Sequence, residues 1–180
     1  MPTDPSCDQS REVLLTVRPA VPEDARALAD LYLASRDAAY PAIPRGVHPP
    51  EEVRRWVTTW FDRDPAARTE VWLAEEAVSG QGAGPVGLVP VGLLLVEEDW
   101  LHSVYVAPGR TGGGIGTLLL DLAKSLRPHG LGLWVFETNH GARRFYARHG
   151  FVEVRRTDGR GETGNEEQEP DLELAWPDVR

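Results

Sequence analysis

A glycine-rich segment that joins a strand pattern to a helix pattern constrains this chain more than any other feature. Residues 104–117 read VYVAPGRTGGGIGT, and glycine stands at positions 109, 112, 113, 114 and 116. Glycine leaves backbone N–H groups unobstructed, and at the first turn of a helix these groups point toward one spot where the helix dipole is positive. The segment therefore predicts an anion-binding site suited to a phosphate group.

Two other phosphate-binding loops fit this segment less well. A Walker A loop ends in Gly-Lys-Ser/Thr, whereas Gly116 is followed by Thr117 and Leu118, so that loop is excluded. A dinucleotide fingerprint would use Gly112 and Gly114, but Thr117 stands at its third glycine. The segment also follows a predicted antiparallel hairpin, whereas a dinucleotide-binding oxidoreductase would place it in an early βαβ unit. A glycine-rich turn without chemical meaning is the remaining alternative.

The rest of the chain alternates between strand and helix patterns. From residue 13 to residue 176 the order is strand, two helices, three strands, helix, strand, helix and two strands. The predicted strands are 13–19, 69–77, 90–96, 100–106, 131–137, 151–156 and 172–176, and the helices start at residues 22, 50, 115 and 139. No internal boundary interrupts this pattern, so we expect one domain over residues 12–180, behind a mobile tail over residues 1–11.

Two of the predicted helices carry a stripe of apolar residues at helical spacing. In the second helix the stripe consists of Val53, Trp56, Val57, Trp60 and Phe61. In the helix after the glycine segment it consists of Ile115, Leu118, Leu119, Leu122 and Leu126. We expect both stripes to face the core, and the alternative for the two tryptophans is that they wall a substrate pocket.

Charge and cysteine content disfavour several classes of function. With 19 basic and 28 acidic residues the formal net charge is −9, which argues against a nucleic-acid-binding surface. The single cysteine, Cys7, excludes an intrachain disulfide and metal sites built on two or more cysteines, and we expect no metal. Since the sequence has neither an apolar run of roughly 20 residues nor a secretory signal, we expect a cytoplasmic protein without a membrane partner.

A second motif lies downstream of the glycine segment. Residues 136–154 read FETNHGARRFYARHGFVEV, which follows the pattern N-x-x-A-x-x-[F/L]-Y-x-x-x-G-F from Asn139 to Phe151. In the first motif, V-x-P is followed by a stretch similar to Q/R-x-x-G-x-G/A, with Thr111 at the position of Gln or Arg. Together, and in this order, the two motifs resemble those of the GNAT superfamily of N-acetyltransferases over nearly the whole chain.

The resemblance implies an α/β GNAT fold. Its mixed sheet of six to seven strands is flanked by about four helices, with a V-shaped cofactor cleft between strands 100–106 and 131–137. It also implies acetyl-CoA as co-substrate, with Val104, Tyr105 and Val106 offering backbone groups to the pantetheine arm and Asn139 contacting the same region. The pyrophosphate would be held by Thr111, Gly112, Gly113, Gly114, Ile115, Gly116 and Thr117. Residues 111–150 carry five basic and two acidic residues, which suits a polyanionic cofactor.

The implied reaction is direct attack of a primary amine on acetyl-CoA. Tyr146, by resemblance, is the general acid, because a phenol with a pKa near ~10 can protonate the departing thiolate. The general base stays open, since Trp134 stands where some family members have a glutamate; the candidates are His102, Glu97, Glu137 and water. A non-catalytic acyl-CoA-binding sensor with the same fold is the alternative function.

The resemblance places the acceptor site at the first two helices, their connection and the loop before the last strand. Here these are residues 40–50, the helix with Trp56 and Trp60, and residues 159–171. The last loop contains the carboxylates Glu162, Glu166, Glu167, Glu169 and Asp171. They favour a cationic amine, either a small molecule or a peptide, although a solvated surface loop looks the same. Homodimers are common in the family, so a homodimer is compatible with the sequence.

Overall fold

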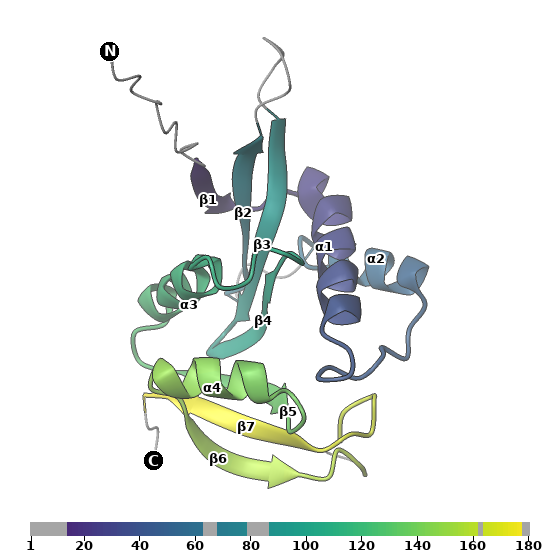
Figure 1. The fold of residues 1–180 in the computed structure, drawn as a ribbon, viewed down its shortest axis with the longest axis vertical. Coiled ribbons are helices and arrows are strands. Elements are labelled where there is room, and N and C mark those ends of the chain that lie inside the picture. The colour runs from purple at the N-terminus through teal and green to yellow at the C-terminus, as the bar shows by residue number, and fades with distance from the viewer. Residues whose placement is uncertain (1–13, 63–67, 79–86, 162–163, 178–180) are drawn as a thin grey trace, which may run out of the picture.

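The computed structural model describes residues 14–62, 68–78, 87–161 and 164–177, which form one seven-stranded sheet in the order β1-β2-β3-β4-β5-β7-β6 (Figure 1). The strands are β1 (Leu15–Pro19), β2 (Glu70–Val78), β3 (Gly87–Glu97), β4 (Trp100–Val106), β5 (Leu131–Phe136), β6 (Val152–Thr157) and β7 (Asp171–Trp176). The helices are α1 (Ala25–Ala38), α2 (Pro50–Thr58), α3 (Ile115–Leu126) and α4 (His140–Arg148), with a 3-10 turn η1 (Pro22–Asp24) before α1. The predicted mixed sheet and its element order are confirmed.

Some sequence predictions fall outside the described residues. The tail over residues 1–11 is among them, so its mobility and the single-domain boundary at residue 12 stay predictions. Within the described ranges, no helix is long and apolar enough to cross a membrane.

Strand β3 is covered on both faces of the sheet. Leu93 and Leu95 pack toward the cluster formed with α1 and α2, whereas Leu94 and Val96 pack toward the cluster formed with α3. A strand that is buried on both faces needs apolar residues at every position, which explains the uninterrupted run VGLLLV. The strand begins at Gly87, before the predicted start at residue 90, because its ladder with β2 continues to the pair Val78↔Gly87.

Helix α3 packs against β3 at a position that only glycine suits. A Cβ atom on Gly92 would lie 2.9 Å from Ile115 Cγ2 and 3.0 Å from Leu119 Cδ1. The buried face of α3 consists of Ile115, Leu119, Leu120 and Ala123. The prediction that Leu118 faces the core is wrong, because this side chain is 44% exposed and Leu120 takes the inner position instead.

The first two helices also differ from their predicted form. The helix predicted from residue 22 begins with the turn η1, in which Asp24 Oδ2 accepts a hydrogen bond from the Val21 N–H at 2.9 Å. Hydrogen bonds from the Arg18 guanidinium hold the pKa of Asp24 below its ordinary value. The second predicted helix is shorter than its apolar stripe, since α2 ends at Thr58 and Trp60 lies in the turn after it. The stripe also divides, since Trp60 is 2% exposed and Trp56 is 41% exposed. Of the two tryptophans, only Trp60 therefore belongs to the core.

Candidate active site

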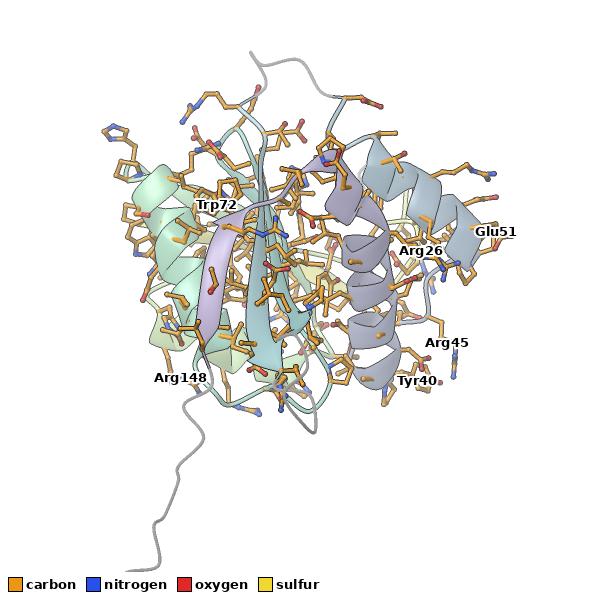
Figure 2. The ribbon with its side chains drawn as sticks, turned by 90° about the horizontal axis from the view of Figure 1, so that it is seen from above. Arg26, Tyr40, Arg45, Glu51, Trp72 and Arg148 are labelled. Carbon is orange, nitrogen blue, oxygen red and sulfur yellow. The ribbon has the colours of Figure 1, made fainter. Side chains whose placement is uncertain are left out.

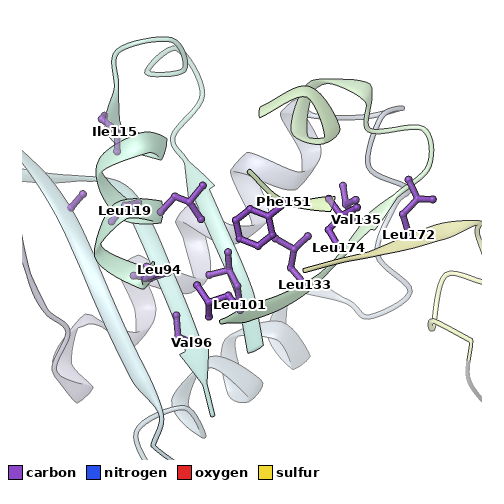
Figure 3. Close-up of a cluster of buried hydrophobic side chains, with 14 of the residues drawn as sticks. Leu94, Val96, Leu101, Ile115, Leu119, Leu133, Val135, Phe151, Leu172 and Leu174 are labelled. Carbon is purple, nitrogen blue, oxygen red and sulfur yellow. The ribbon is translucent and has the colours of Figure 1, made fainter. Parts of the chain in front are cut away.

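Strands β4 and β5 meet at one end and separate from there. The two parallel strands are paired only at Trp100↔Gly132, where the Gly132 N–H also bonds to Asp99 O at 2.9 Å. A bulge at His102, between the pairs Leu95↔Ser103 and Val96↔Leu101, adds local twist to β4. In Figure 3 the strands meet near Leu101 and Leu133 and then diverge. The predicted V-shaped arrangement of these two strands is therefore present.

Every second residue of β4 directs its backbone groups toward the space between the diverging strands β4 and β5. The Ala107 N–H bonds to Val91 O on β3 at 2.8 Å, and backbone directions alternate along a strand. The N–H groups of Val104 and Val106 therefore point away from β3, toward the side where β5 diverges. Tyr105 differs from the prediction for this strand, because the same alternation turns its backbone groups toward β3.

The glycine segment forms the connection from β4 to α3 with several amides free at the helix start. Gly109, Gly112 and Gly114 have φ values of 78°, 83° and 86°, in the left-handed region that favours glycine. The first intrahelical bond of α3 runs from the Leu118 N–H to Gly114 O at 3.0 Å. The amides of Ile115, Gly116 and Thr117 therefore have no acceptor within their own helix. In the same segment, Arg110 is paired with Glu76, with 2.7 Å between Nε and Oε2.

Helix α4 explains most of the second motif through its two ends. Asn139 Oδ1 accepts a hydrogen bond from the Ala142 N–H at 3.1 Å and caps the helix, which leaves the side-chain amide as a donor. Gly150, with φ of 82°, follows the end of the helix, and Phe151 enters the core. His149 Nδ1 lies 2.8 Å from Phe145 O, a carbonyl in the last turn of the helix.

Tyr146 lies on α4 among aromatic rings. Its ring centroid is 5.3 Å from that of Phe145 and 5.4 Å from that of Phe151. Burial raises the pKa of Tyr146 to about 12, because desolvation disfavours the phenolate. The phenol therefore keeps its proton across the whole neutral range.

A cavity of about 700 Å³ lies on the α1 and α2 side of the sheet. It is lined by Tyr32, Leu33, Arg36, Asp37, Tyr40, Pro44, Arg45, Gly46, Val47, His48, Glu52, Val53, Trp56, Glu166 and Glu167. Figure 2 shows Tyr40 and Arg45 together beyond the end of α1, where the Arg45 guanidinium carbon lies 4.6 Å from the centre of the Tyr40 ring. The cavity joins the three segments from which the sequence predicted an acceptor site, and we call it the acceptor cavity.

Helix α1 places this cavity next to the diverging strands. Ser35 Oγ donates a hydrogen bond to Val106 O at the end of β4, with a distance of 3.1 Å. The Arg36 guanidinium carbon lies 6.0 Å from the centre of the Phe136 ring at the end of β5. The Tyr32 and Tyr105 rings, 5.0 Å apart, connect the cavity wall to β4. One turn of α1 thus contacts the ends of both strands and also lines the acceptor cavity.

An ion pair and a histidine–carboxylate contact hold the β6–β7 loop against the cavity. Arg36 Nη2 lies 2.5 Å from Glu167 Oε1, and both side chains are largely buried. His48 contacts Glu166 Oε2 through Nε2 at 3.0 Å. The loop is braced internally by Asn165, whose Nδ2 donates to Asp171 Oδ2 at 2.9 Å. Glu166 and Glu167 therefore form part of the cavity wall, whereas Glu169 is exposed as in a solvated surface loop.

Similarity to known proteins identifies the family. A family model described as an acetyltransferase (GNAT) domain matches residues 67–153. Phosphinothricin N-acetyltransferase of Streptomyces coelicolor is 32% identical over 146 residues, which cover 77% of this chain and 82% of that protein. The chain belongs to the GNAT superfamily of N-acetyltransferases. This membership confirms the resemblance found in the two motifs and makes the protein an acetyltransferase of a family that binds acyl-CoA.

Solved structures show the same GNAT fold at lower identity. The solution structure of apo YjaB from Escherichia coli has a TM-score of 0.64 at 23% identity and covers 92% of this chain and 99% of YjaB. The PaiA N-acetyltransferase of Thermoplasma acidophilum, in complex with coenzyme A, has a TM-score of 0.59 at 17% identity, covering 90% and 98% of the two chains. These similarities show the fold alone.

The candidate bases of this GNAT enzyme lie in two places. Glu97 and His102 pair with each other near the β3–β4 turn, with 3.5 Å between Glu97 Oε2 and His102 Nε2. Glu137, directly after β5, accepts a hydrogen bond from Arg156. Trp134, at the usual glutamate position, instead stacks parallel to Trp100 with 6.4 Å between the ring centroids.

Sequence reasoning missed the side chains that assemble the acceptor cavity. It named the segments, but not Tyr32, Arg36 or His48. Arg36 meets Glu167 across 131 residues and His48 meets Glu166 across 118 residues of sequence. No local pattern marks such partners, because their proximity arises only when the sheet has formed.

Proposed function

We propose that this GNAT enzyme transfers the acetyl group of acetyl-CoA to a primary amine bound in the acceptor cavity. The observation that carries the proposal is the position of Ser35 and Arg36. Ser35 bonds to the end of β4, while Arg36 lies beside the end of β5 and lines the cavity. An amine in the cavity would therefore lie close to an acyl group held between the diverging strands.

Backbone groups carry most of the proposed cofactor binding. The outward amides of Val104 and Val106 suit the pantetheine arm, and the unpaired amides at the start of α3 suit the pyrophosphate. The side-chain amide of Asn139 is available as a further donor. Among the acyl-CoA molecules that could act as donor, we propose acetyl-CoA.

The proposed reaction begins when the neutral amine attacks the thioester carbonyl. A β4 backbone N–H stabilises the oxyanion that forms, and the amine loses a proton to a base. The intermediate then collapses, breaking the carbon–sulfur bond, and Tyr146 gives its proton to the thiolate. His102, Glu97, Glu137 and a water molecule remain the candidate bases, and His102→Gln removes only the first of them.

The charges around the cavity favour a cationic acceptor. Four carboxylates and two guanidinium groups line it, in addition to His48. The exposed rings of Tyr40 and Trp56 add faces on which a cation can rest. A small-molecule amine or a peptide amine in a cytoplasmic setting fits this surface, and phosphinothricin is one amine to test because the Streptomyces relative is named for it.

The decisive experiment incubates the protein with acetyl-CoA and a panel of amines, and follows the release of free thiol. The panel holds phosphinothricin, a polyamine, an aminoglycoside, free amino acids and peptides. We expect thiol release with at least one cationic amine. Acetyl-CoA binding without thiol release across the panel would support the sensor alternative, and no acetyl-CoA binding would defeat the proposed cofactor.

Replacing Tyr146 by phenylalanine tests the general acid. We expect Tyr146→Phe to lower kcat at least about tenfold, because the thiolate then leaves without a positioned proton. Acetyl-CoA affinity should change little, since the ring is kept. Because burial raises the pKa of Tyr146 to about 12, its ionisation should not reduce the wild-type kcat below about pH 10.

Tyr105→Phe is the matched variant, because it also removes a hydroxyl from a tyrosine whose pKa burial raises. We expect a smaller loss of kcat from it than from Tyr146→Phe. Equal losses, or an unchanged kcat in Tyr146→Phe, would contradict the acid role.

A further inference from the structure

His48 connects two walls of the acceptor cavity. Its Nδ1 lies 3.0 Å from Glu52 Oε2 on α2, and its Nε2 lies 3.0 Å from Glu166 Oε2 on the β6–β7 loop. All three residues line the cavity. One imidazole ring thus ties the loop to the helix at the cavity's edge.

The two contacts determine the protonation state of the ring. An ionised carboxylate only accepts hydrogen bonds, so each ring nitrogen must contribute an N–H group. Neutral imidazole has one N–H group, whereas imidazolium has two. The bridge is therefore complete only when His48 is protonated, and the hydrogen bonds to Glu52 and Glu166 raise the pKa of His48 accordingly.

Besides His48, Glu52 and Glu166, four other charged residues line the cavity: Arg36 and Asp37 on α1, Arg45 on the connecting segment and Glu167 on the loop. The pair Arg36–Glu167 holds one side of the loop. His48 is about half exposed, so its ring exchanges protons with solvent while it faces Glu52 and Glu166.

We propose that protonated His48 is a positioning residue that latches the β6–β7 loop onto α2 and thereby completes the acceptor cavity. The pair Arg36–Glu167 is the permanent anchor of the loop, and His48 is the conditional one. The latch is fully present below the ordinary pKa of histidine, near ~6.5, and is lost as the pH rises through the raised value. The effect on catalysis rests on the proposed function, whereas the latch itself does not.

The latch can be measured without any activity. NMR titration of the ring signals gives the pKa of His48 in the wild-type protein and in Glu166→Gln and Glu52→Gln. We expect each variant to lower this pKa, because one carboxylate partner is removed. His129→Gln removes another exposed histidine, from the turn between α3 and β5, and should leave the His48 titration unchanged. An ordinary His48 pKa that is the same in wild type and Glu166→Gln would overturn the proposal.

The kinetic test follows the KM of the acceptor amine against pH. As the pH rises and the latch opens, we expect the KM of the wild-type protein to rise about threefold relative to the KM of His48→Arg. An increase of this size is in keeping with the energy of an exposed ion pair. His48→Arg keeps a permanently charged side chain that can donate to both carboxylates, so the rise of KM with pH should be absent. His48→Gln lacks the charge, so its KM should be higher than that of His48→Arg at every pH. If His48→Arg and His48→Gln behave alike, His48 does not position the loop through its charge.

The two readouts separate the two proposals. Absence of acetyl transfer with every amine would defeat the proposed function, while the NMR titration would still decide the latch. If the NMR shifts are as expected but the acceptor KM of the wild-type protein does not rise with pH relative to His48→Arg, the positioning role is contradicted and the proposed acetyl transfer is unaffected.

Discussion

The part of the molecule that would hold the cofactor and the part that would hold the acceptor are built in different ways. The cofactor part consists of β4, α3, β5 and α4, which follow one another in the chain. The acceptor part joins α1 and α2 to the β6–β7 loop through contacts such as Arg36–Glu167, across 131 residues. Local motifs can describe the first part, whereas the second exists only in the folded protein.

The two parts also use different chemical groups. In the cofactor part the proposed ligands are mainly backbone amides at Val104, Val106 and the start of α3, and glycine conformation decides whether they are available. In the acceptor part the cavity is shaped by side chains, including paired charges and Trp56. We therefore expect backbone strain to damage the first part and side-chain truncation to damage the second.

The largest effect is expected from the two tryptophans of the acceptor part. Trp60 is 2% exposed, so Trp60→Ala should lower the free energy of unfolding by about 4 kcal/mol through lost burial and a cavity. Trp56 is 41% exposed, so Trp56→Ala should cost only about 1 kcal/mol but should raise the acceptor KM. Urea denaturation and steady-state kinetics measure the two quantities. Equal losses of stability would show that the two rings share one role.

An intermediate effect is expected from a backbone change in the cofactor part. Gly114 has a φ of 86°, which strains a β-branched residue by about 2 kcal/mol, so Gly114→Val should weaken acetyl-CoA binding about thirtyfold. Isothermal titration calorimetry gives the Kd. The acceptor cavity should be unaffected, because none of its lining residues comes from this loop.

Gly113→Ala is the matched control for this change. Gly113 lies in the same loop without a positive φ, and an added Cβ would meet only Arg110 O, at an ordinary 3.5 Å. We expect its Kd to change by less than about threefold. If both variants weaken binding equally, side-chain bulk and not glycine conformation controls the loop.

The same contrast explains how much could be predicted from the sequence. The order of elements follows from local patterns, and the divergence of β4 from β5 is implied by the family resemblance; both agree with the structure. The opposite outcomes of Trp56 and Trp60 did not follow, because both satisfy the same helical spacing and only the neighbouring elements decide which ring is covered. The roles of Tyr146 and the glycine loop in catalysis and binding stay predictions.

The smallest effect is expected from Glu167→Ala, and it tests whether the two parts are independent. Arg36 and Glu167 have side-chain exposures of 14% and 13%, so removing the carboxylate leaves a mostly buried guanidinium with only neutral acceptors such as Pro44 O. We expect a loss of about 1 kcal/mol of stability and a rise in the acceptor KM of about fivefold, with the acetyl-CoA Kd within twofold of wild type.

Glu169→Ala removes an exposed carboxylate from the same loop and should change neither constant. A matching rise in the acetyl-CoA Kd in Glu167→Ala would mean that Arg36, which lies beside Phe136 at the end of β5, transmits the state of the acceptor cavity to the cofactor site. In that case the two parts function as one unit although the chain builds them differently.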